Sequence, residues 1–516
     1  MDVNQQHRGL RMRPIITKRT PPPPSSSLDG SGGGGGKEEE KLEEPLSPGA
    51  RIFHTSKLNC CIIAMFGCET EYNVGVMREG LKQTLIKHPR FSSVLVVDEK
   101  NDRKQSWVRT NVNLDDHIIV PEIDPNMDSP DQFVEDYVSD LTTTFIDKSK
   151  PLWEFHILNV KTSDANAVAV FKIHHSLGDG ISLTSLLLAC TRKSSDPEAL
   201  PTLPMTKKTD PDAKGLRKYL VAIWLALALI WNTIVQSVLF SATMIFLKDS
   251  DTPIKGAPGV ERTRKRIVRK IISFDDVRTV KSAMNVTVND VILGITQAGL
   301  SRYLNRRYGD EAKAKGEVNE KRDYLPKNIR LRATTLANIR PVAGIQDVAL
   351  MMEKGSKSRW GNAIGYILIP FHIALQDDPL NCIREAKSAV DKKKLSLEAS
   401  FSHYGGKLIL EKFGPEAASI SSYRTIANAT MSFSNVAGPV EEVTFYGHPI
   451  TFVAPTVYGH PQSLTVHFQS YADKMIIVLA ADEVHVPDPH QLCDDLVESL
   501  QLAKNAVERQ RSSEQS

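Results

Sequence analysis

Apolar residues along the first half of the chain follow two periods that alternate. Short runs rich in β-branched and aromatic residues predict strands at 58–67, 91–99, 152–160 and 167–173. Apolar residues spaced three and four apart predict helices at 74–89, 131–145 and 181–193. A polar turn joins the last two strands, which predicts a hairpin. Strands and helices in alternation are typical of an α/β fold with layered sheets.

The second half shows the same alternation from residue 267 onward. The segment 267–307 predicts a strand, a helix and then a long amphipathic helix that begins after the letters TVND. Further strands are predicted at 365–373, 431–439, 451–459, 463–471 and 474–482. Helices are predicted around 383–394 and over 487–507, where the fold closes.

Length and composition divide the chain into two folded domains and two tails. A chain of 516 residues is too long for one ordinary core. Residues 1–48 contain PPPPSSS, GSGGGGG and KEEEKLEE, which cannot bury enough apolar surface to offset the entropy of ordering. We expect disorder there and at 506–516. We expect an N-terminal domain at 49–205, a linker at 206–266 and a C-terminal domain at 267–505.

The linker contains the segment 219–247, which has no charged residue. A helix of about 20 residues spans the hydrocarbon core of a bilayer, so this segment is long enough to cross. Lysines and arginines flank it on both sides, and the positive-inside rule favours keeping both flanks on the cytoplasmic face. We therefore expect a re-entrant or interfacial hairpin with a bend near Asn232 and Gln236. A single span and a buried helix pair are the alternatives.

Overall composition narrows the class of protein. Apolar residues make up 41% of the chain and charged residues 24%, as in folded and largely soluble proteins. The net charge of +3 gives no support for nucleic-acid binding, which normally requires a concentrated basic face. The six cysteines form no CxxC pair, which argues against a disulfide framework and suits a reducing compartment. No apolar region follows the basic N-terminal residues, so no secretory signal is predicted, and Asp2 argues against a transit peptide.

The most informative short motif is HHSLGDG, at residues 174–180. It follows a predicted strand and precedes a predicted helix, so His174 and His175 lie at a strand end, where side chains commonly reach a cleft. Asp179 is suited to cap the following helix by accepting a backbone N–H. Gly178 and Gly180 permit backbone angles and close approach that larger residues forbid.

A histidine in this position can act as a general base on an alcohol. Its pKa near neutrality allows it to remove the hydroxyl proton as the oxygen attacks a thioester. No Gly-x-Ser-x-Gly elbow is present, in agreement with a reaction that needs no covalent intermediate. His175 fits the role of general base best. For His174 a structural role and a role in the reaction are equally good interpretations. Asp179 fits a role as helix cap better than a role in catalysis. A metal site is not predicted, because His175 and Asp179 lack the usual ligand spacing and an evident third ligand.

Four further motifs accompany HHSLGDG in the same chain. They are PLWEFHI at 151–157, VNDVILG at 288–294, ANIRP at 337–341 and SNVAGP at 434–439. In their order and approximate spacing, the five motifs resemble those of wax ester synthase/diacylglycerol acyltransferases of the plant and bacterial type. The resemblance covers essentially residues 49–505.

This resemblance implies a fold, a reaction and substrates. The fold would be two coenzyme-A-dependent acyltransferase domains, each an α/β sandwich, with an active-site tunnel at their interface. Long-chain acyl-CoA would be a co-substrate, with no further cofactor, and its acyl group would pass to a fatty alcohol or a diacylglycerol. The products would be a wax ester or a triacylglycerol.

The resemblance also implies roles for individual residues. His175 matches the general base and His174 its neighbour, while Asp179 matches the aspartate that holds the loop and Gly180 the glycine of its turn. These are the expected residues of the catalytic loop.

Four residues outside the loop are candidates as well. Asn289 and Asp290 match the ND pair of the family, and Asn289 is a candidate donor to the oxyanion or to the acyl group. Asn435 is a second candidate donor. Arg340 could pair with Asp179 and clamp the loop, on charge complementarity alone.

The expected location is the endoplasmic reticulum membrane, with the plasma membrane also possible. Two halves that share one active site must lie on the same side of the bilayer, here the cytoplasmic face. Two alternative functions remain. One is an acyltransferase of soluble metabolites, whose characteristic DFGWG-like segment is not found in this sequence. The other is a non-catalytic lipid-binding protein, in which His175 would be dispensable. The preferred acceptor, its chain length and the oligomeric state stay open.

Overall fold

The computed structural model describes residues 43–98, 104–204, 216–316, 323–339 and 360–515. Residues 1–42 of the expected N-terminal tail lie outside this part of the chain. The expectation of disorder is wrong for residues 43–48. Strand β1 (Glu43–Pro45) pairs antiparallel with β4 (Lys104–Arg109), and helix α1 (Pro48–Ile52) begins at the end of the expected tail.

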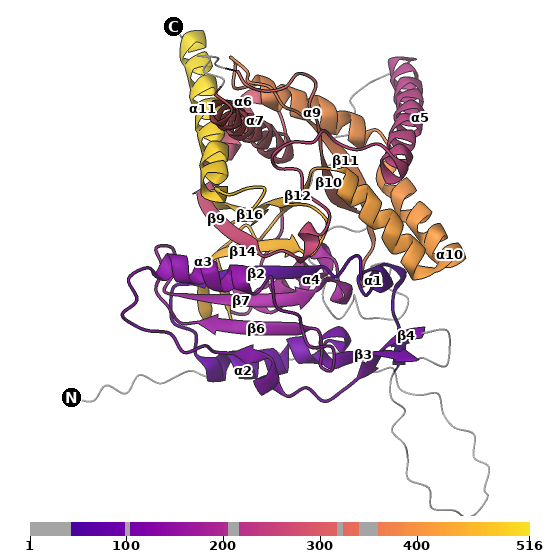
Figure 1. Cartoon of the computed structure of the whole chain (residues 1–516). Helices are drawn as coiled ribbons and strands as arrows, with labels where there is room; N and C mark the ends of the chain where they lie inside the picture. Colours follow the sequence, from indigo (N-terminus) through magenta and orange to yellow (C-terminus); the bar gives the residue numbers. More distant parts are fainter. Residues whose placement is uncertain (1–42, 99–103, 205–215, 317–322, 340–359, 516) are drawn as a thin grey trace, which may run out of the picture.

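A seven-stranded sheet forms the core of the first unit, in the lower part of Figure 1. Its strands, in spatial order, are β5 (Ile118–Ile119), β6 (Trp153–Leu158), β7 (Ala167–His174), β2 (Cys61–Cys68), β14 (His448–Tyr458), β13 (Val443–Phe445) and β8 (Thr191–Lys193). The predicted hairpin is confirmed, because β6 and β7 pair antiparallel with Trp153 opposite Ile173. All eight residues of β7 are buried, which explains its unbroken apolar pattern.

The helices of the first unit agree with the predictions in type but are shorter. They are α2 (Val74–Gln83), α3 (Pro130–Asp140) and α4 (Gly180–Ala189). The helix predicted at 181–193 ends early because its last residues form the edge strand β8. A separate three-stranded sheet, in the order β1, β4, β3 (Ser93–Asp98), extends the unit beside α1.

A six-stranded sheet forms the core of the second unit, in the upper part of Figure 1. Its strands, in spatial order, are β11 (Ile364–His372), β10 (Arg330–Asn338), β12 (Met431–Val436), β15 (Leu464–Tyr471), β16 (Lys474–Asp482) and β9 (Lys265–Ser273). The helices that pack with this sheet and with one another are α6 (Phe274–Met284), α7 (Val288–Ala314), α9 (Asn381–Lys394) and α11 (Pro489–Gln515). The expectation of a disordered tail at 506–516 is wrong for residues 506–515, because helix α11 continues to Gln515.

The two units are not separate stretches of sequence, as the predicted boundary at 205 would require. Strands β13 and β14 belong to the C-terminal half of the chain but complete the first sheet. β14 pairs antiparallel with β2, the central strand, with Val453 opposite Phe66. Phe445 and Phe452 are therefore part of the first hydrophobic core. The two-unit α/β architecture is confirmed, but a domain confined to 49–205 is wrong.

The apolar segment predicted as a hairpin is one continuous helix, α5 (Leu216–Ile245), of 30 residues. No bend interrupts it at Asn232 or Gln236, so the hairpin is wrong. Of the described helices, α5 alone has the length and composition to cross a membrane, and only 6% of its most apolar window is buried. It projects at the upper right of Figure 1, away from α11.

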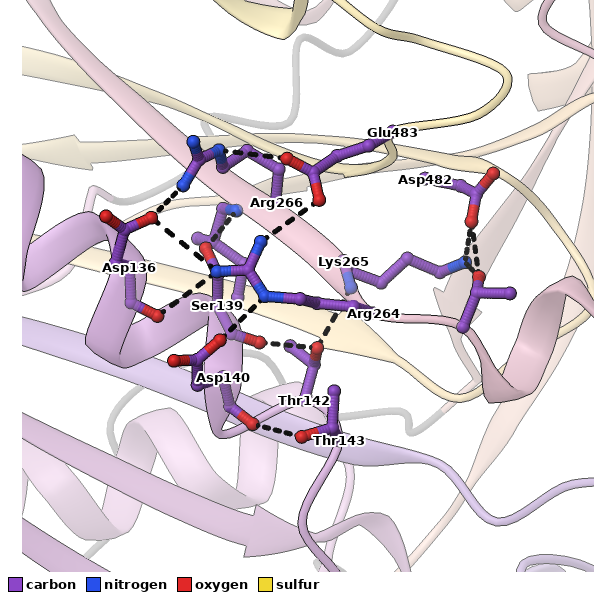
Figure 2. A network of polar contacts seen from close by, with 12 residues as sticks. Asp136, Ser139, Asp140, Thr142, Thr143, Arg264, Lys265, Arg266, Asp482 and Glu483 are labelled. Atoms are coloured by element: carbon purple, nitrogen blue, oxygen red, sulfur yellow. Dashed lines mark hydrogen bonds and ion pairs between the residues drawn. The ribbon is translucent and has the colours of Figure 1, made fainter.

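A network of ion pairs fastens the two units together near the start of β9 (Figure 2). The Nε of Arg264 lies 2.7 Å from the carboxylate of Asp140 on α3, and its Nη1 lies 3.0 Å from Glu483. Arg266 pairs with Asp136 of α3 and with Glu483 as well. Because α3 belongs to the first unit and β9 to the second, these contacts join the two units.

Between these partly exposed arginines lies a buried ion pair. The Nζ of Lys265 is 3.6 Å from the carboxylate of Asp482, and the side chains are 3% and 2% exposed. Lys265 also donates to the carbonyl oxygen of Val260 at 2.6 Å, and Asp482 accepts from Thr263. Burial lowers the pKa of Lys265 to about 8, against the effect of the Asp482 carboxylate.

We expect the substitution Asp482→Ala to destabilise the protein by about 3–5 kcal/mol, because it leaves the buried charge of Lys265 unpaired. Arg264→Ala, which breaks exposed ion pairs in the same network, should cost only about 0–1 kcal/mol. The midpoints of urea unfolding of the two variants measure the difference. Equal losses would contradict the larger contribution expected of the buried Lys265–Asp482 pair to stability.

Candidate active site

The HHSLGDG loop lies where β7 ends and α4 begins. The strand ends at His174, residues His175–Leu177 form a single 3-10 turn, and α4 starts at Gly180. The backbone N–H of His175 donates to the carbonyl oxygen of Cys60 at 2.9 Å, which extends the ladder between β7 and the chain before β2. The loop is thereby held to the central strands of the first sheet.

Asp179 caps helix α4, as the sequence predicts. One carboxylate oxygen accepts the backbone N–H of Ser182 at 3.0 Å, and the other accepts the N–H of Ala363 at 3.0 Å. The side chain is buried, and Ala363 belongs to the second half of the chain. One carboxylate therefore fixes both the start of α4 and the contact between the two halves.

His175 is buried, with 4% of its surface exposed. Its ring stacks on Phe53, just after α1, with centroids 4.4 Å apart. Burial lowers its pKa below the ordinary value, against the opposing effects of its own carbonyl oxygen, Asp179 and Asn362. Its Nδ1 is buried and makes no hydrogen bond of good geometry to any described residue. At neutral pH the imidazole is therefore uncharged and can accept a proton.

His174 has a different environment from that of His175. Its Nδ1 lies 2.7 Å from the hydroxyl of Ser176 and its Nε2 lies 2.9 Å from the amide oxygen of Asn59. The ring stacks on His54 at 4.7 Å, and burial lowers its pKa well below the ordinary value. Because both ring nitrogens are engaged, this arrangement favours a role in holding the loop over a role as a base.

A short segment of the second half lies across the loop. This strap, residues 360–363, immediately precedes β11. The indole N–H of Trp360 donates to the carbonyl oxygen of Leu177 at 2.7 Å. The side-chain amide N–H of Asn362 donates to the backbone carbonyl oxygen of His175 at 3.1 Å. The strap is not among the elements predicted from the sequence, where its one local signal is the letters WGNA before an apolar strand.

The structure leaves two of the loop expectations without support. Arg340, the expected partner of Asp179, lies outside the described residues, so this pairing stays a prediction. Gly180 has no positive φ, and a Cβ atom at its position would meet nothing within 4 Å. The protein's own packing therefore does not require glycine there, and the steric reason given for Gly180 is wrong.

The candidate oxyanion donors Asn289 and Asn435 come together although they are far apart in sequence. The amide N–H of Asn435, in β12, donates to the amide oxygen of Asn289, in the first turn of α7, at 3.4 Å. Within the described part of the chain, no hydrogen bond joins either residue to His175. Asp290 forms a capping box with Thr287 at the start of α7.

His460 is a second neighbour of His175 that the sequence analysis missed. It follows β14, is buried, and its Nε2 lies 2.9 Å from the hydroxyl of Thr465. Burial, with the charges of Lys265 and His175, lowers its pKa to about 3. Among the described residues, no group of three or more His, Cys, Asp or Glu side chains is placed to hold a metal ion.

Comparisons with known proteins agree along most of the chain. Residues 47–292 match the model of the wax ester synthase/diacylglycerol acyltransferase catalytic domain, and residues 360–504 match the WS/DGAT C-terminal domain. The chain is 51% identical to wax ester synthase/diacylglycerol acyltransferase 11 of Arabidopsis thaliana, over 90% of this chain and 95% of that protein. It is 49% identical to number 5 of the same series, over 92% and 95%.

Solved structures share the fold at much lower identity. A wax ester synthase/diacylglycerol acyltransferase from Marinobacter aquaeolei VT8 matches with a TM-score of 0.56 and 16% identity, over 90% of this chain and 99% of that one. The first condensation domain of the calcium-dependent antibiotic synthetase matches with a TM-score of 0.52 and 10% identity, over 87% and 91%.

Two mixed α/β units with a buried histidine loop at their junction, in a chain with these relatives, define a protein of the acyltransferase class. More specifically, the chain belongs to the wax ester synthase/diacylglycerol acyltransferase family. The resemblance inferred from the five motifs is thus confirmed.

We expect Asn362→Ala to lower kcat about tenfold, the effect of losing one well-placed hydrogen bond of about 1.4 kcal/mol. The side chain of Asn362 holds the carbonyl oxygen of His175 and raises the pKa of its ring, so its loss should also move the acidic limb of the pH–rate profile to lower pH. Trp360→Phe removes a strap contact that does not reach the imidazole, and should leave the limb in place. If the acidic limb of the pH–rate profile stays at the same pH in Asn362→Ala, the Asn362 side chain has no influence on the pKa of His175.

Proposed function

We propose that this acyltransferase moves a long-chain acyl group from acyl-CoA to the hydroxyl of a fatty alcohol or a diacylglycerol, forming a wax ester or a triacylglycerol. The observation that carries the proposal is the uncharged, buried imidazole of His175 at the junction of the two units. The names of the Arabidopsis thaliana relatives support both kinds of acceptor.

The reaction that fits this site is direct transfer. His175 accepts the hydroxyl proton while the oxygen attacks the thioester carbonyl carbon. The tetrahedral intermediate expels the thiolate of CoA, and the proton on His175 passes to that sulfur. Burial supports this role, because a base that is uncharged at neutral pH is ready to take a proton at the start of each cycle.

Asn289 and Asn435 remain the proposed donors to the oxyanion. Their mutual contact supports a shared function, because the two amides converge from β12 and from the first turn of α7. A helix N-terminus also offers unpaired N–H groups and a favourable dipole for negative charge. Substrate binding would have to bring the thioester oxygen within reach of these donors.

The proposed tunnel lies between the two units, with acyl-CoA and acceptor entering from opposite sides. Its support is that the catalytic loop of the first unit is covered by the strap of the second, so His175 lies at the interface. The long, exposed apolar helix α5 supports association with a membrane. We propose the cytoplasmic face of the endoplasmic reticulum, and the plasma membrane as a second location.

Replacement of His175 by Ala should lower ester formation at least about 100-fold, the usual scale of positioned acid–base catalysis. The assay combines purified protein with palmitoyl-CoA and either hexadecanol or dipalmitoylglycerol. Ser176→Ala is a matched control in the same turn and should retain far more activity. Equal rates for the wild type and His175→Ala would remove His175 from the mechanism. No product with either acceptor would favour transfer to soluble metabolites or a lipid-binding role.

The pH–rate profile should report the buried base. Because burial depresses the pKa of His175, the acidic limb of kcat/KM is expected to have its midpoint below 6.5, with full activity at pH 7. The rate falls as pH decreases through that pKa, since protonated imidazole cannot accept the hydroxyl proton. A midpoint above 6.5 would show that a different group, or a solvated histidine, is the base.

A further inference from the structure

Helix α5 has one polar stripe, and that stripe faces the protein. Thr233, Gln236, Phe240 and Thr243 are spaced by three and four residues, so they lie on one side of the helix. The hydroxyl of Thr233 accepts the backbone N–H of Leu397 at 3.1 Å. Thr233 is therefore a contact with the second unit.

The same stripe is fixed at three more points. Lys393 of α9 donates to the amide oxygen of Gln236 at 2.5 Å, and Asn428 donates to the carbonyl oxygen of Thr243 at 2.6 Å. Arg332 of β10, paired with Asp249 at 2.6 Å, also donates to Thr243. These contacts hold the C-terminal half of α5 against the folded protein.

The opposite face of α5 is apolar and exposed along the whole helix. Its large side chains are all between 44% and 69% exposed: Tyr219, Leu220, Ile223, Trp224, Leu227, Ile230, Trp231, Ile234, Val238, Leu239 and Ile245. Monomeric proteins rarely leave so continuous an apolar surface in water. Because the exposed row continues past Thr233, it also covers the half of α5 that packs on the protein.

Helix α10 (Glu398–Asn428) continues this surface. Leu397, Phe401, Tyr404 and Leu408 lie on one face of the helix, by their spacing of four, three and four, and each is at least 41% exposed. Phe401 also contacts Phe240 of α5, with ring centroids 6.2 Å apart. Helices α5 and α10 therefore pack against each other through the buried side of α5, beside the exposed row of α10.

The far end of the α10 surface is marked by a bend. The helix is interrupted at Gly414, which has a φ of 82°, and is followed by Pro415. Phe413, immediately before the bend, is 73% exposed. Lys392 and Lys394 are exposed next to Leu397, where they can meet anionic headgroups.

A membrane crossing by α5 conflicts with these contacts. A crossing needs about 20 residues in the hydrocarbon core, without polar attachments to a soluble domain. From Tyr219 to Asn232, ahead of the first polar attachment at Thr233, the helix has only about 14 residues, or about 21 Å. The contacted half could not enter the bilayer without breaking the hydrogen bonds of Gln236 and Thr243.

We propose that α5 and α10 together form a monotopic docking face for a phospholipid bilayer. The apolar rows of both helices enter a single leaflet, and α5 lies along the membrane surface without crossing it. The continuous exposed row on α5, the second exposed row on the adjacent α10 and the nearby lysines fit an interfacial helix pair. This deepens the membrane association in the proposed function and relies on that function only for the substrate.

The part of α10 beyond Gly414 packs toward the catalytic histidine. α10 packs on α1 (Figure 1), where the hydroxyls of Thr55 and Ser419 are 2.5 Å apart. Phe53, which stacks on His175, shares a hydrophobic cluster with Ile426 of α10. The α10–α1 contact therefore links the docking helix pair, through Phe53, to the residues that pack on His175.

Flotation with vesicles of phosphatidylcholine and phosphatidylserine tests the role of α10, independently of ester formation. Tyr404→Asp and Leu408→Asp should each lower the vesicle partition coefficient about tenfold or more, since each removes one apolar side chain of the α10 row and α5 is unchanged. Phe145→Asp changes an exposed phenylalanine of the first unit and should leave binding as in the wild type. Wild-type binding by both α10 variants would overturn the α10 part of the proposal. Concentration-dependent dimers that lose binding to vesicles would identify a second copy as the occupant.

The tryptophans of α5 test its orientation. Trp224 and Trp231 lie on the exposed row and are separated by two turns, about 10 Å along the helix. Variants Trp224→Phe and Trp231→Phe each leave one α5 tryptophan, and the double variant measures the background. The vesicles contain lipids with a nitroxide at a shallow or a deep acyl position. The fluorescence of Trp224 and that of Trp231 should each be quenched most by the shallow nitroxide. Strongest quenching of Trp231 by the deep label would indicate a span centred there. Strongest deep quenching of Trp224 would indicate steep insertion, and either result would overturn the proposal.

Discussion

The buried carboxylate of Asp179 is the contact on which the proposed active site depends. One of its oxygens caps α4 and the other accepts the backbone N–H of Ala363, so one side chain joins the two units next to His175. A buried carboxylate that lost either donor would carry a large desolvation cost. The loop therefore has its observed shape only while the strap is in place. Phe53 then covers the imidazole and keeps it uncharged, which ties its chemistry to the packing of both halves.

Local patterns predicted most elements, because burial on one or both faces leaves a period in the sequence. The strand ending at His174 and the capping role of Asp179 follow from such local rules. Long-range pairing has no such signature. The insertion of β14 beside β2, the strap at Asn362 and the approach of Asn289 to Asn435 depend on contacts between residues far apart in sequence. The same limit explains the missed neighbours Phe53 and His460.

For the segment 219–247, the prediction of an apolar helical element is correct, whereas the predicted hairpin geometry is wrong. Its lack of charge identified an unusual apolar helix, and its isolated polar residues suggested a bend. In the structure Gln236 lies with Thr233 on a stripe that hydrogen-bonds to the second unit, and the helix continues without interruption through Asn232 and Gln236. A polar residue in an apolar helix can mark a protein contact as well as a break, and only the partner distinguishes the two.

The insertion of β14 also has a consequence for how the protein is made. The ribosome releases the chain from its N-terminus, so β2 emerges hundreds of residues before the strand that covers one of its edges. Until residues 448–458 are synthesised, the nascent first unit exposes the edge of its central strand, a surface prone to aggregation. Helix α5 leaves the ribosome during the same interval. The growing chain therefore holds an incomplete sheet and an exposed apolar helix at once, which makes translation the period of greatest dependence on chaperones.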